Sequence, residues 1–285
     1  MTCKRAKGEE WDSKVSVFGS TGFIGSEFCR LSSLPTVSIP KKERVPRSEQ
    51  ILYLISTTHN QNIFSDLTLD YQTNIGVLLE ALSEFRETGG VFNFVSSWFV
   101  YGNCALPAKE ESACQPRGFY SMTKRTAEQL LITYCETFGL AYRIFRLSNV
   151  IGPTDRWSKE KNALQYLISE MAHDRDITLS AGGNFFRDYL HVEDVVRALD
   201  LCLLSAPLNS IINIGSGKRY LFRNLIDMAH MQLKSKSRII ESADDKVTDS
   251  YLDVSKIRAL GFEPSRSIES SITEICNCER KLKAG

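Results

Sequence analysis

The stretch KVSVFGSTGFIGSEF (residues 14–28) decides the fold of this chain. A short apolar run at residues 14–18 meets a cluster of three glycines, and apolar residues with helical spacing follow over residues 23–34. A strand, a glycine-rich turn and a helix in this order are typical of the phosphate-binding start of a parallel sheet. We therefore expect this segment to open a doubly wound α/β fold.

Each glycine of the turn has a role that a side chain would prevent. Gly19 permits the tight turn, Gly22 lets the backbone approach a phosphate, and Gly25 lets the helix pack closely on the sheet. The helix N-terminus then offers N–H groups and the positive end of its dipole to the anion. The spacing of three and three differs from the commonest dinucleotide fingerprint, and a turn that only requires positive φ is the alternative. We expect a dinucleotide to contact Gly19, Thr21, Gly22, Phe23, Ile24 and Gly25.

Strands and helices alternate along the rest of the first half. Residues 51–55 form a near-continuous apolar run, as expected for a strand that is covered on both faces. Long helices are predicted over residues 69–87 and 119–138, and strands over residues 91–96 and 142–147. This order predicts a Rossmann-type doubly wound parallel sheet.

The second half is less regular. We expect residues 1–150 to form an NAD(P)-binding Rossmann domain and residues 151–285 to form mainly a smaller substrate-binding part. The two should be interleaved, because segments of residues 186–214, with strand-like runs near residues 188 and 212, are predicted to return to the first domain.

The composition is that of an ordinary globular protein. The chain has 285 residues, of which 42% are hydrophobic and 24% charged, and 35 basic against 34 acidic residues leave a net charge of +1. This balance argues against nucleic acid or an anionic membrane as the main partner. No apolar run approaches the length of a membrane span, and the first residues lack the apolar core of a signal peptide.

Cysteine and histidine patterns indicate no metal site. The eight cysteines have irregular spacings with no CxxC pair, and the four histidines form no HExxH motif. We therefore expect reduced thiols in a cytoplasmic protein.

Tyr120 and Lys124 lie four residues apart on the second long helix, so both project from one face. A lysine ammonium near a phenol lowers the phenol pKa and makes it usable as an acid or base. Ser97 follows the strand at residues 91–96, at the end of a parallel sheet where ligands bind. We predict that Ser97, Tyr120 and Lys124 are catalytic; the alternative for the helical pair is an ordinary solvated face.

Further motifs occur in a recognisable order. Together with the glycine turn and the Ser97, Tyr120 and Lys124 group, these motifs make the chain resemble the extended short-chain dehydrogenase/reductase family that acts on nucleotide sugars. The resemblance extends from about residue 14 to about residue 264. It rests on GSTGFIG (19–25), YQTNIG (71–76), SSWFVYG (96–102), LPAKE (106–110), YSMTK (120–124), RLSNVIGP (146–153), FRDYLHVEDVVRA (186–198), NIGSG (213–217) and LDVSKIRALGFEP (252–264).

The resemblance implies roles for individual residues. Tyr120 is expected to exchange a proton with the sugar oxygen, and Lys124 is expected also to hold the nicotinamide ribose. Asn74, Tyr120 and Lys124 are therefore expected among the cofactor contacts. The substrate, a nucleotide-diphosphate sugar, is expected to contact Ser97, Trp98, Asn149 and Arg187.

The chain departs from the family near its second strand. Only about sixteen residues separate the first helix from the run at residue 51, so one βα unit near residues 36–50 should be missing. The acidic residue that normally holds the adenosine ribose is absent, and a basic loop with Lys41 and Arg44 takes its place. This favours NADP, with Lys41 and Arg44 near the 2′-phosphate. NAD, with a solvated loop, is the alternative.

Two other departures restrict the reaction. Trp98 and Phe99 stand where sugar 4,6-dehydratases of the family carry Asp-Glu, and Trp98 and Thr154 stand where 3,5-epimerising relatives carry Cys and His. Without these residues we expect neither dehydration nor 3,5-epimerisation. The remaining reaction is hydride transfer at one carbon, and we expect reduction of a nucleotide-linked 4-keto sugar. The alternatives are a nucleotide-sugar 4-epimerase similar to UDP-glucose 4-epimerase and a non-catalytic dinucleotide-binding sensor or scaffold.

Some polar and aromatic residues have weaker assignments. We expect His191 to be structural. His59 and Asn60 should line the sugar pocket or cap a loop, and Arg156 and Trp157 should lie in a loop over the site.

The two long helices carry more apolar residues than one buried stripe needs, and relatives pair through such helices. This predicts a homodimer that involves Leu67, Leu69, Leu78, Leu79, Leu130, Leu131, Tyr134 and Phe138.

Overall fold

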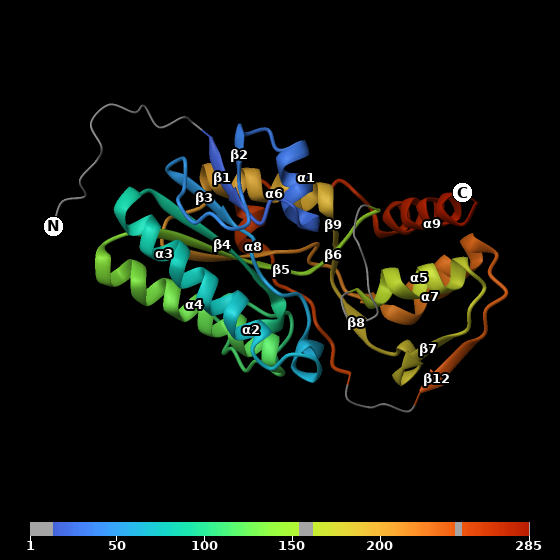
Figure 1. Cartoon of the computed structure of the whole chain (residues 1–285). Helices are drawn as coiled ribbons and strands as arrows, with labels where there is room; N and C mark the ends of the chain where they lie inside the picture. The colour runs from blue at the N-terminus through green and yellow to red at the C-terminus, as the bar shows by residue number, and fades with distance from the viewer. Residues whose placement is uncertain (1–13, 154–161, 243–246, 285) are drawn as a thin grey trace.

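A six-stranded parallel sheet forms the centre of the larger lobe (Figure 1). The computed structural model describes residues 14–153, 162–242 and 247–284. The strand order is β10-β5-β4-β3-β1-β2, and each neighbouring pair is parallel, which confirms the predicted Rossmann-type fold. The strands are β1 (Val15–Phe18), β2 (Thr36–Ile39), β3 (Gln50–Tyr53), β4 (Val91–Ser97), β5 (Ala141–Leu147) and β10 (Ser210–Ile214).

Helices cover both faces of this sheet (Figure 1). On one face, α3 (Val77–Thr88) and α4 (Phe119–Phe138) bury side chains such as Phe85 and Leu131 against β3, β4 and β5. On the other face, α1 (Phe23–Leu31), α6 (Val192–Ser205) and α8 (Ser255–Ala259) share a second core. Because both faces are covered, β3 and β4 are buried almost throughout.

The glycine turn between β1 and α1 is as tight as the sequence predicts. Gly19 has φ +83°, a conformation that side chains rarely adopt. A Cβ on Gly25 would lie 2.2 Å from the Gly19 carbonyl oxygen, so α1 can pack on the turn only without a side chain there. This contact places the start of α1 directly beyond the end of β1.

The sheet ends at β2. Within residues 40–49, which lead from β2 to β3, the structure has neither a helix nor a strand. The Ser16 and Ser48 hydroxyls lie 2.7 Å apart, and the Arg47 N–H donates to Ser16 Oγ at 2.9 Å, so the connection is held against β1. β2 is therefore the edge strand of the sheet, and Lys41 and Lys42 follow its carboxyl end.

The smaller lobe is built on three helices, α5 (Ala163–Ala172), α7 (Phe222–Leu233) and α9 (Ile268–Ala284). They share a core that includes Ile168, Ile226 and Ile272. Its parallel strand pair is β7 (Ile177–Ser180) with β12 (Ile239–Ser242).

Short strands connect the two lobes (Figure 1). β6 (Asn149–Ile151) pairs with β9 (Tyr189–His191), and β8 (Phe186–Arg187) pairs with β11 (Tyr220–Leu221). The segment near residue 188 therefore does not join the large sheet as expected, whereas β10 does. Leu252, Ile257 and Phe262 also return to the core of the larger lobe, which the sequence analysis did not anticipate.

The helix expected over residues 69–87 is interrupted. It consists of α2 (Leu69–Tyr71), the π-helical turn η2 (Gln72–Gly76) and α3. Elsewhere in the described part of the chain, short 3₁₀ turns occur at η1 (Asn60–Phe64), η3 (Trp98–Val100) and η4 (Ala181–Gly183). A π-turn holds an extra residue, and here it contains the buried Asn74.

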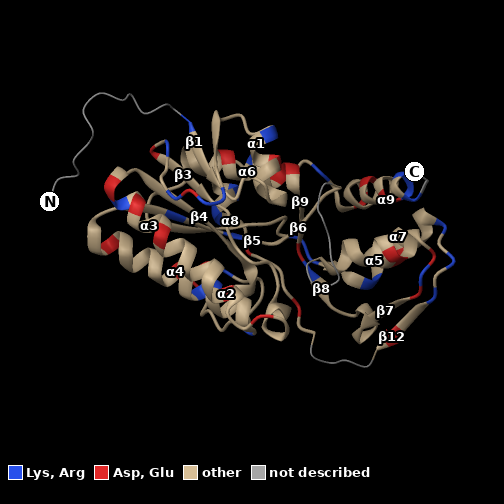
Figure 2. Cartoon of the chain, in the orientation of Figure 1, with Lys and Arg blue, Asp and Glu red and all other residues tan. Residues whose placement is uncertain are grey.

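Basic and acidic residues are interspersed over both lobes (Figure 2). Among the described residues, no helix is long and apolar enough to cross a membrane. Within the same ranges, no cluster of three or more His, Cys, Asp or Glu side chains could hold a metal ion.

Candidate active site

The cavity next to the glycine turn, here called the first cavity, has a volume of about 290 Å³. The turn lines it with Gly19, Gly22 and the first residues of α1, Phe23 to Gly25; Thr21 does not line it. The first turn of a helix has N–H groups without acceptors inside the helix, and the glycines leave their backbone uncovered. This wall fits the diphosphate of a dinucleotide.

The three predicted catalytic residues line the same cavity. Ser97 ends β4, and Tyr120 and Lys124 enter from the first turns of α4. Ser97 Oγ accepts the Phe99 N–H at 3.4 Å, and Ser97 and Tyr120 line the same cavity wall. The structure thus brings together side chains from two segments that lie more than twenty residues apart in the sequence.

Lys124 is fixed within the larger lobe. Its side chain is buried, its Nζ donates to the Val95 carbonyl oxygen at 2.8 Å, and it lies 4.1 Å from the centre of the Phe94 ring. Burial lowers the pKa of Lys124 to about 7, and the nearby Glu128 carboxylate opposes this shift.

The pKa of Tyr120 differs from the sequence-based expectation. Burial raises the pKa of Tyr120 to about 12, and hydrogen bonds with Ser97 and Ser56 only partly oppose this. The expectation that the lysine charge dominates is wrong here, because both groups are buried and Lys124 is bonded to a backbone carbonyl. At neutral pH Tyr120 therefore carries its proton.

Asn74 lies behind the cavity wall and does not line it. The side chain is buried, and its oxygen accepts from the Thr57 N–H at 2.9 Å and from the Ser56 hydroxyl at 3.0 Å. Its nitrogen donates to Thr57 Oγ1 at 2.8 Å and to Thr123 Oγ1 at 2.9 Å. Asn74 thus joins the end of β3 to α4, whereas the family resemblance suggests a direct cofactor contact.

The basic loop after β2 does not line the first cavity. Arg44 turns toward α3, where its Nε donates to Glu80 Oε2 at 2.8 Å, and its Nη1 donates to the carbonyl of Lys41 at 2.8 Å. The Lys41 side chain is exposed. The structure therefore does not support a phosphate contact for Arg44 and leaves one for Lys41 as a prediction.

A second cavity of about 570 Å³ lies between the lobes and shares Trp98, Phe99, Asn149, Val150 and Asn162 with the first. Three of the predicted substrate residues, Trp98, Asn149 and Arg187, line it. Trp98 Nε1 donates to Asn149 Oδ1 at 3.3 Å, and the Arg187 guanidinium lies 5.6 Å from the Trp98 ring centre. A molecule that occupies both cavities would pass Trp98 beside Ser97 and Tyr120.

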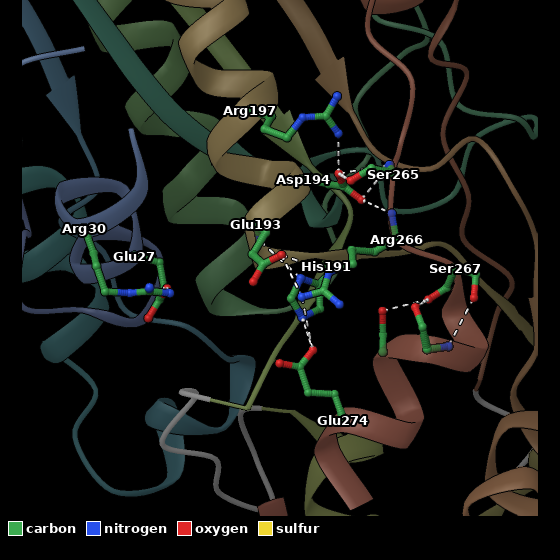
Figure 3. A network of polar contacts seen from close by, with 12 residues as sticks. Glu27, Arg30, His191, Glu193, Asp194, Arg197, Ser265, Arg266, Ser267 and Glu274 are labelled. Atoms are coloured by element: carbon green, nitrogen blue, oxygen red, sulfur yellow. Dashed lines mark hydrogen bonds and ion pairs between the residues drawn. The ribbon is translucent and has the colours of Figure 1, made fainter. Parts of the chain in front are cut away.

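The histidines lie outside both cavities. His191 is buried at the start of α6, where its Nδ1 accepts the Glu193 N–H at 3.3 Å and its Nε2 lies 3.3 Å from Glu274 Oε2 (Figure 3). Burial lowers the pKa of His191. This neutral, capping histidine fits the structural role expected of it.

His59 caps η1, since its Nδ1 accepts the Gln61 N–H at 3.3 Å, and Asn60 Oδ1 accepts the Ser121 N–H at 3.2 Å. Of the two expected roles, lining the sugar pocket or capping a loop, both residues therefore have the second. Thr154, Arg156 and Trp157 lie outside the described residues.

Three cavity-lining residues were not predicted from the sequence: Ser56 of the first cavity, and Phe185 and Tyr189 of the second. A signal for Ser56 existed, because it follows an apolar strand just as Ser97 does.

A Rossmann-type sheet, a glycine turn and a Ser-Tyr-Lys group at one cavity define an enzyme of the short-chain dehydrogenase/reductase type. The model of the NAD dependent epimerase/dehydratase family matches residues 41–215, and the chain belongs to that family. The predicted resemblance and enzyme class are thereby confirmed, and so is a nicotinamide dinucleotide as the kind of cofactor.

The chain is similar both to a protein named as a nucleotide-sugar 4-epimerase and to one named as a nucleotide-sugar reductase. A putative UDP-glucose 4-epimerase of Methanocaldococcus jannaschii is 29% identical over 181 residues, which are 62% of this chain but only 59% of that protein. GDP-6-deoxy-D-mannose reductase of Pseudomonas aeruginosa is 25% identical, over 92% of this chain and 95% of that protein. The structure of RMD from Pseudomonas aeruginosa with NADPH has a TM-score of 0.83 at 21% identity, over 95% of this chain and 100% of that one, which supports the fold.

We expect Tyr120→Phe to lower kcat by ~10²–10⁴-fold, the usual contribution of a positioned general acid or base. Thermal unfolding and cofactor affinity should change little, because only one oxygen is lost. Tyr134→Phe, the same change on the outer part of α4, is the control and should keep its turnover. Near wild-type turnover in Tyr120→Phe would show that the assigned chemistry is wrong.

Proposed function

We propose that this enzyme reduces a nucleotide-linked 4-keto sugar with NADPH. The observation that carries the proposal is the buried Tyr120, which keeps its proton and lines the first cavity together with Ser97 and Lys124. A protonated phenol is ready to donate, as ketone reduction requires. An epimerase begins with the opposite step, in which the tyrosine removes a proton from an alcohol.

In the proposed reaction, bound NADPH supplies a hydride to the carbonyl carbon. Tyr120 donates its phenolic proton to the carbonyl oxygen. Ser97 donates a hydrogen bond to the same oxygen, because its Oγ already accepts the Phe99 N–H and its own proton is available. Lys124 would hold the nicotinamide ribose, and Trp98, Asn149 and Arg187 line the space for the substrate's diphosphate and sugar.

The relatives give separate support. The reductase relative matches over 95% of its length, whereas the epimerase relative matches over 59%. A 4-epimerase remains the second candidate, because it would use the same three side chains. Cytoplasmic location and the absence of nucleic acid and membrane partners stay predictions from composition.

Cofactor stoichiometry distinguishes the candidates. A reductase should consume one NADPH for each product molecule when it is given nucleotide-linked 4-keto sugars. An epimerase should convert nucleotide sugars with no net change in cofactor, and a non-catalytic binding protein should do neither. The measurement is NADPH absorbance together with chromatographic analysis of the products; conversion without NADPH consumption would contradict the reductase proposal.

We further propose that Lys41 gives the preference for NADPH. Lys41 follows β2 two residues after Ile39, which pairs with Phe18 just before the glycine turn. Lys41→Ala should weaken NADPH binding about 10- to 100-fold, the loss of one charge-assisted hydrogen bond, and leave NADH binding unchanged. Arg44→Ala is the matched control, since Glu80 already holds this guanidinium. Titration of both cofactors tests this, and equal wild-type affinities for NADPH and NADH would contradict it.

We also propose a homodimer through α3 and α4. Of the apolar residues expected at the interface, Leu78 and Leu131 are instead buried against the sheet. Leu79 on α3 and Phe138 on α4 are each 43% exposed, and Leu67, in the turn before α2, is 61% exposed; a partner subunit would remove this apolar surface from water. Sedimentation should give a dimer at micromolar concentration, and Leu79→Glu should shift it to monomer; a wild-type monomer would contradict the proposal.

A further inference from the structure

Tyr120 lies in the first turn of α4, where a helix is held least firmly. α4 begins at Phe119, so Tyr120 is its second residue. The N–H groups of a first turn have no acceptors inside the helix, and the side chain of the preceding residue usually caps them. Here the preceding residue is Gly118, which has no side chain that could act as a cap. The turn that carries the phenol therefore depends on a cap from elsewhere.

The position before α4 accepts only glycine. Gly118 has φ +96° and ψ 161°, a conformation that is open almost only to glycine. A Cβ at this position would also lie 2.4 Å from Cγ of Asn60, which is too close for two carbon atoms. Asn60 thus fills the space in which the side chain of an ordinary capping residue would begin.

Asn60 supplies the missing cap from η1. Its Oδ1 accepts the Ser121 N–H at 3.2 Å, and its Nδ2 donates to the Arg117 carbonyl oxygen at 3.4 Å. One amide side chain therefore joins the residues before and after the start of the helix. Ser121 is the third residue of α4, a position whose N–H an N-cap side chain normally binds. Asn60 thus does for α4 what a residue at position 118 cannot do.

The segment that carries Asn60 is itself held in place. Asn62, two residues further along η1, donates through Nδ2 to Asp70 Oδ1 at 2.7 Å, and both side chains are buried. Asp70 belongs to α2, and a buried carboxylate without a donor is costly, so this contact fixes η1 to α2. Asn60 lines neither cavity, so any effect it has on the site is transmitted through α4.

We propose that Asn60 is a positioning residue for Tyr120, because it caps the helix turn that carries the phenol. The inference rests on the proposed function, in which Tyr120 is the proton donor. Without the cap, the first turn of α4 would fray, and the phenol would no longer be held in the cavity wall with Ser97 and Lys124. A displacement of about 1 Å at a reacting group can lower the rate by ~100-fold. Asn60 should therefore affect the rate of proton transfer and leave the binding of cofactor and substrate unchanged.

Amide hydrogen exchange tests the cap without any reaction, by mass spectrometry of peptides from the start of α4. In Asn60→Ala the peptide that contains Ser121 should exchange about 2- to 30-fold faster, the range expected when a helix loses its N-cap. The later turns of α4 should exchange as in the wild type. Asn60→Asp keeps an acceptor oxygen and adds a negative charge at the helix N-terminus, so its first turn should stay protected. Unchanged exchange in Asn60→Ala would overturn the proposal.

Steady-state kinetics test the consequence for the site. Asn60→Ala should lower kcat about 10-fold and leave KM and the cofactor dissociation constant unchanged, and Asn60→Asp should restore kcat. Ser267→Ala is the matched control, because Ser267 Oγ accepts the Ser270 N–H at 3.1 Å at the start of α9 and Ser267 lines neither cavity (Figure 3). This control should lose a similar amount of thermal stability and keep its kcat.

The outcomes separate the two proposals. An unchanged kcat in Asn60→Ala, or an Asn60→Asp variant as slow as Asn60→Ala, would show that the cap does not position Tyr120. Full activity of Tyr120→Phe would instead refute the proposed function, because the phenol would then not be the proton donor. The exchange measurement needs no substrate, so it tests the cap in either case.

Discussion

The buried ion pair between Glu128 and Arg146 holds helix α4 in place, and the geometry of the site depends on it. Arg146 of β5 donates to both carboxylate oxygens of Glu128, at 3.0 Å through Nε and 2.8 Å through Nη2, and neither side chain is more than 1% exposed. Two charges buried in this way depend on each other, because removal of either would leave the other unpaired in a low-dielectric interior. The pair therefore fixes the height and rotation of α4 over the sheet.

The positions of the proposed catalytic residues on α4 follow from this ion pair. Lys124 lies one helical turn before Glu128, so it enters the lobe on the same face and reaches the Val95 carbonyl. Tyr120 lies one turn earlier still and lines the first cavity together with Ser97 and Ser56, near the ends of β4 and β3. One helix face thus carries, in order, the proposed acid Tyr120, the proposed cofactor-binding Lys124 and the anchoring Glu128. The cost of burying Lys124 is visible in its lowered pKa.

The position of the substrate cavity depends on the strands that connect the lobes. Asn149 on β6 and Arg187 on β8 line this cavity. Neither strand belongs to the large sheet: β6 pairs with β9, and β8 pairs with β11. Trp98 belongs to the larger lobe yet contacts Asn149 and lies close to Arg187. The side chain beside the catalytic serine therefore also forms part of the wall where the lobes meet.

The parallel sheet, the glycine turn and the group of Ser97, Tyr120 and Lys124 could be predicted from the sequence, because each depends on a local pattern. These patterns are runs of apolar residues, glycines between a strand and a helix, a serine after a strand, and two side chains four positions apart on a helix. Four features became apparent only from the folded chain: Asn74 lies behind the cavity in a π-turn, Arg44 pairs with Glu80, the segment near residue 188 pairs with β6, and Ser56 lines the first cavity together with Tyr120. Local spacing sets the face on which a side chain lies. Its hydrogen-bond partner and its burial, and through burial the pKa of Tyr120, depend on segments brought together only when the helices pack on the sheet.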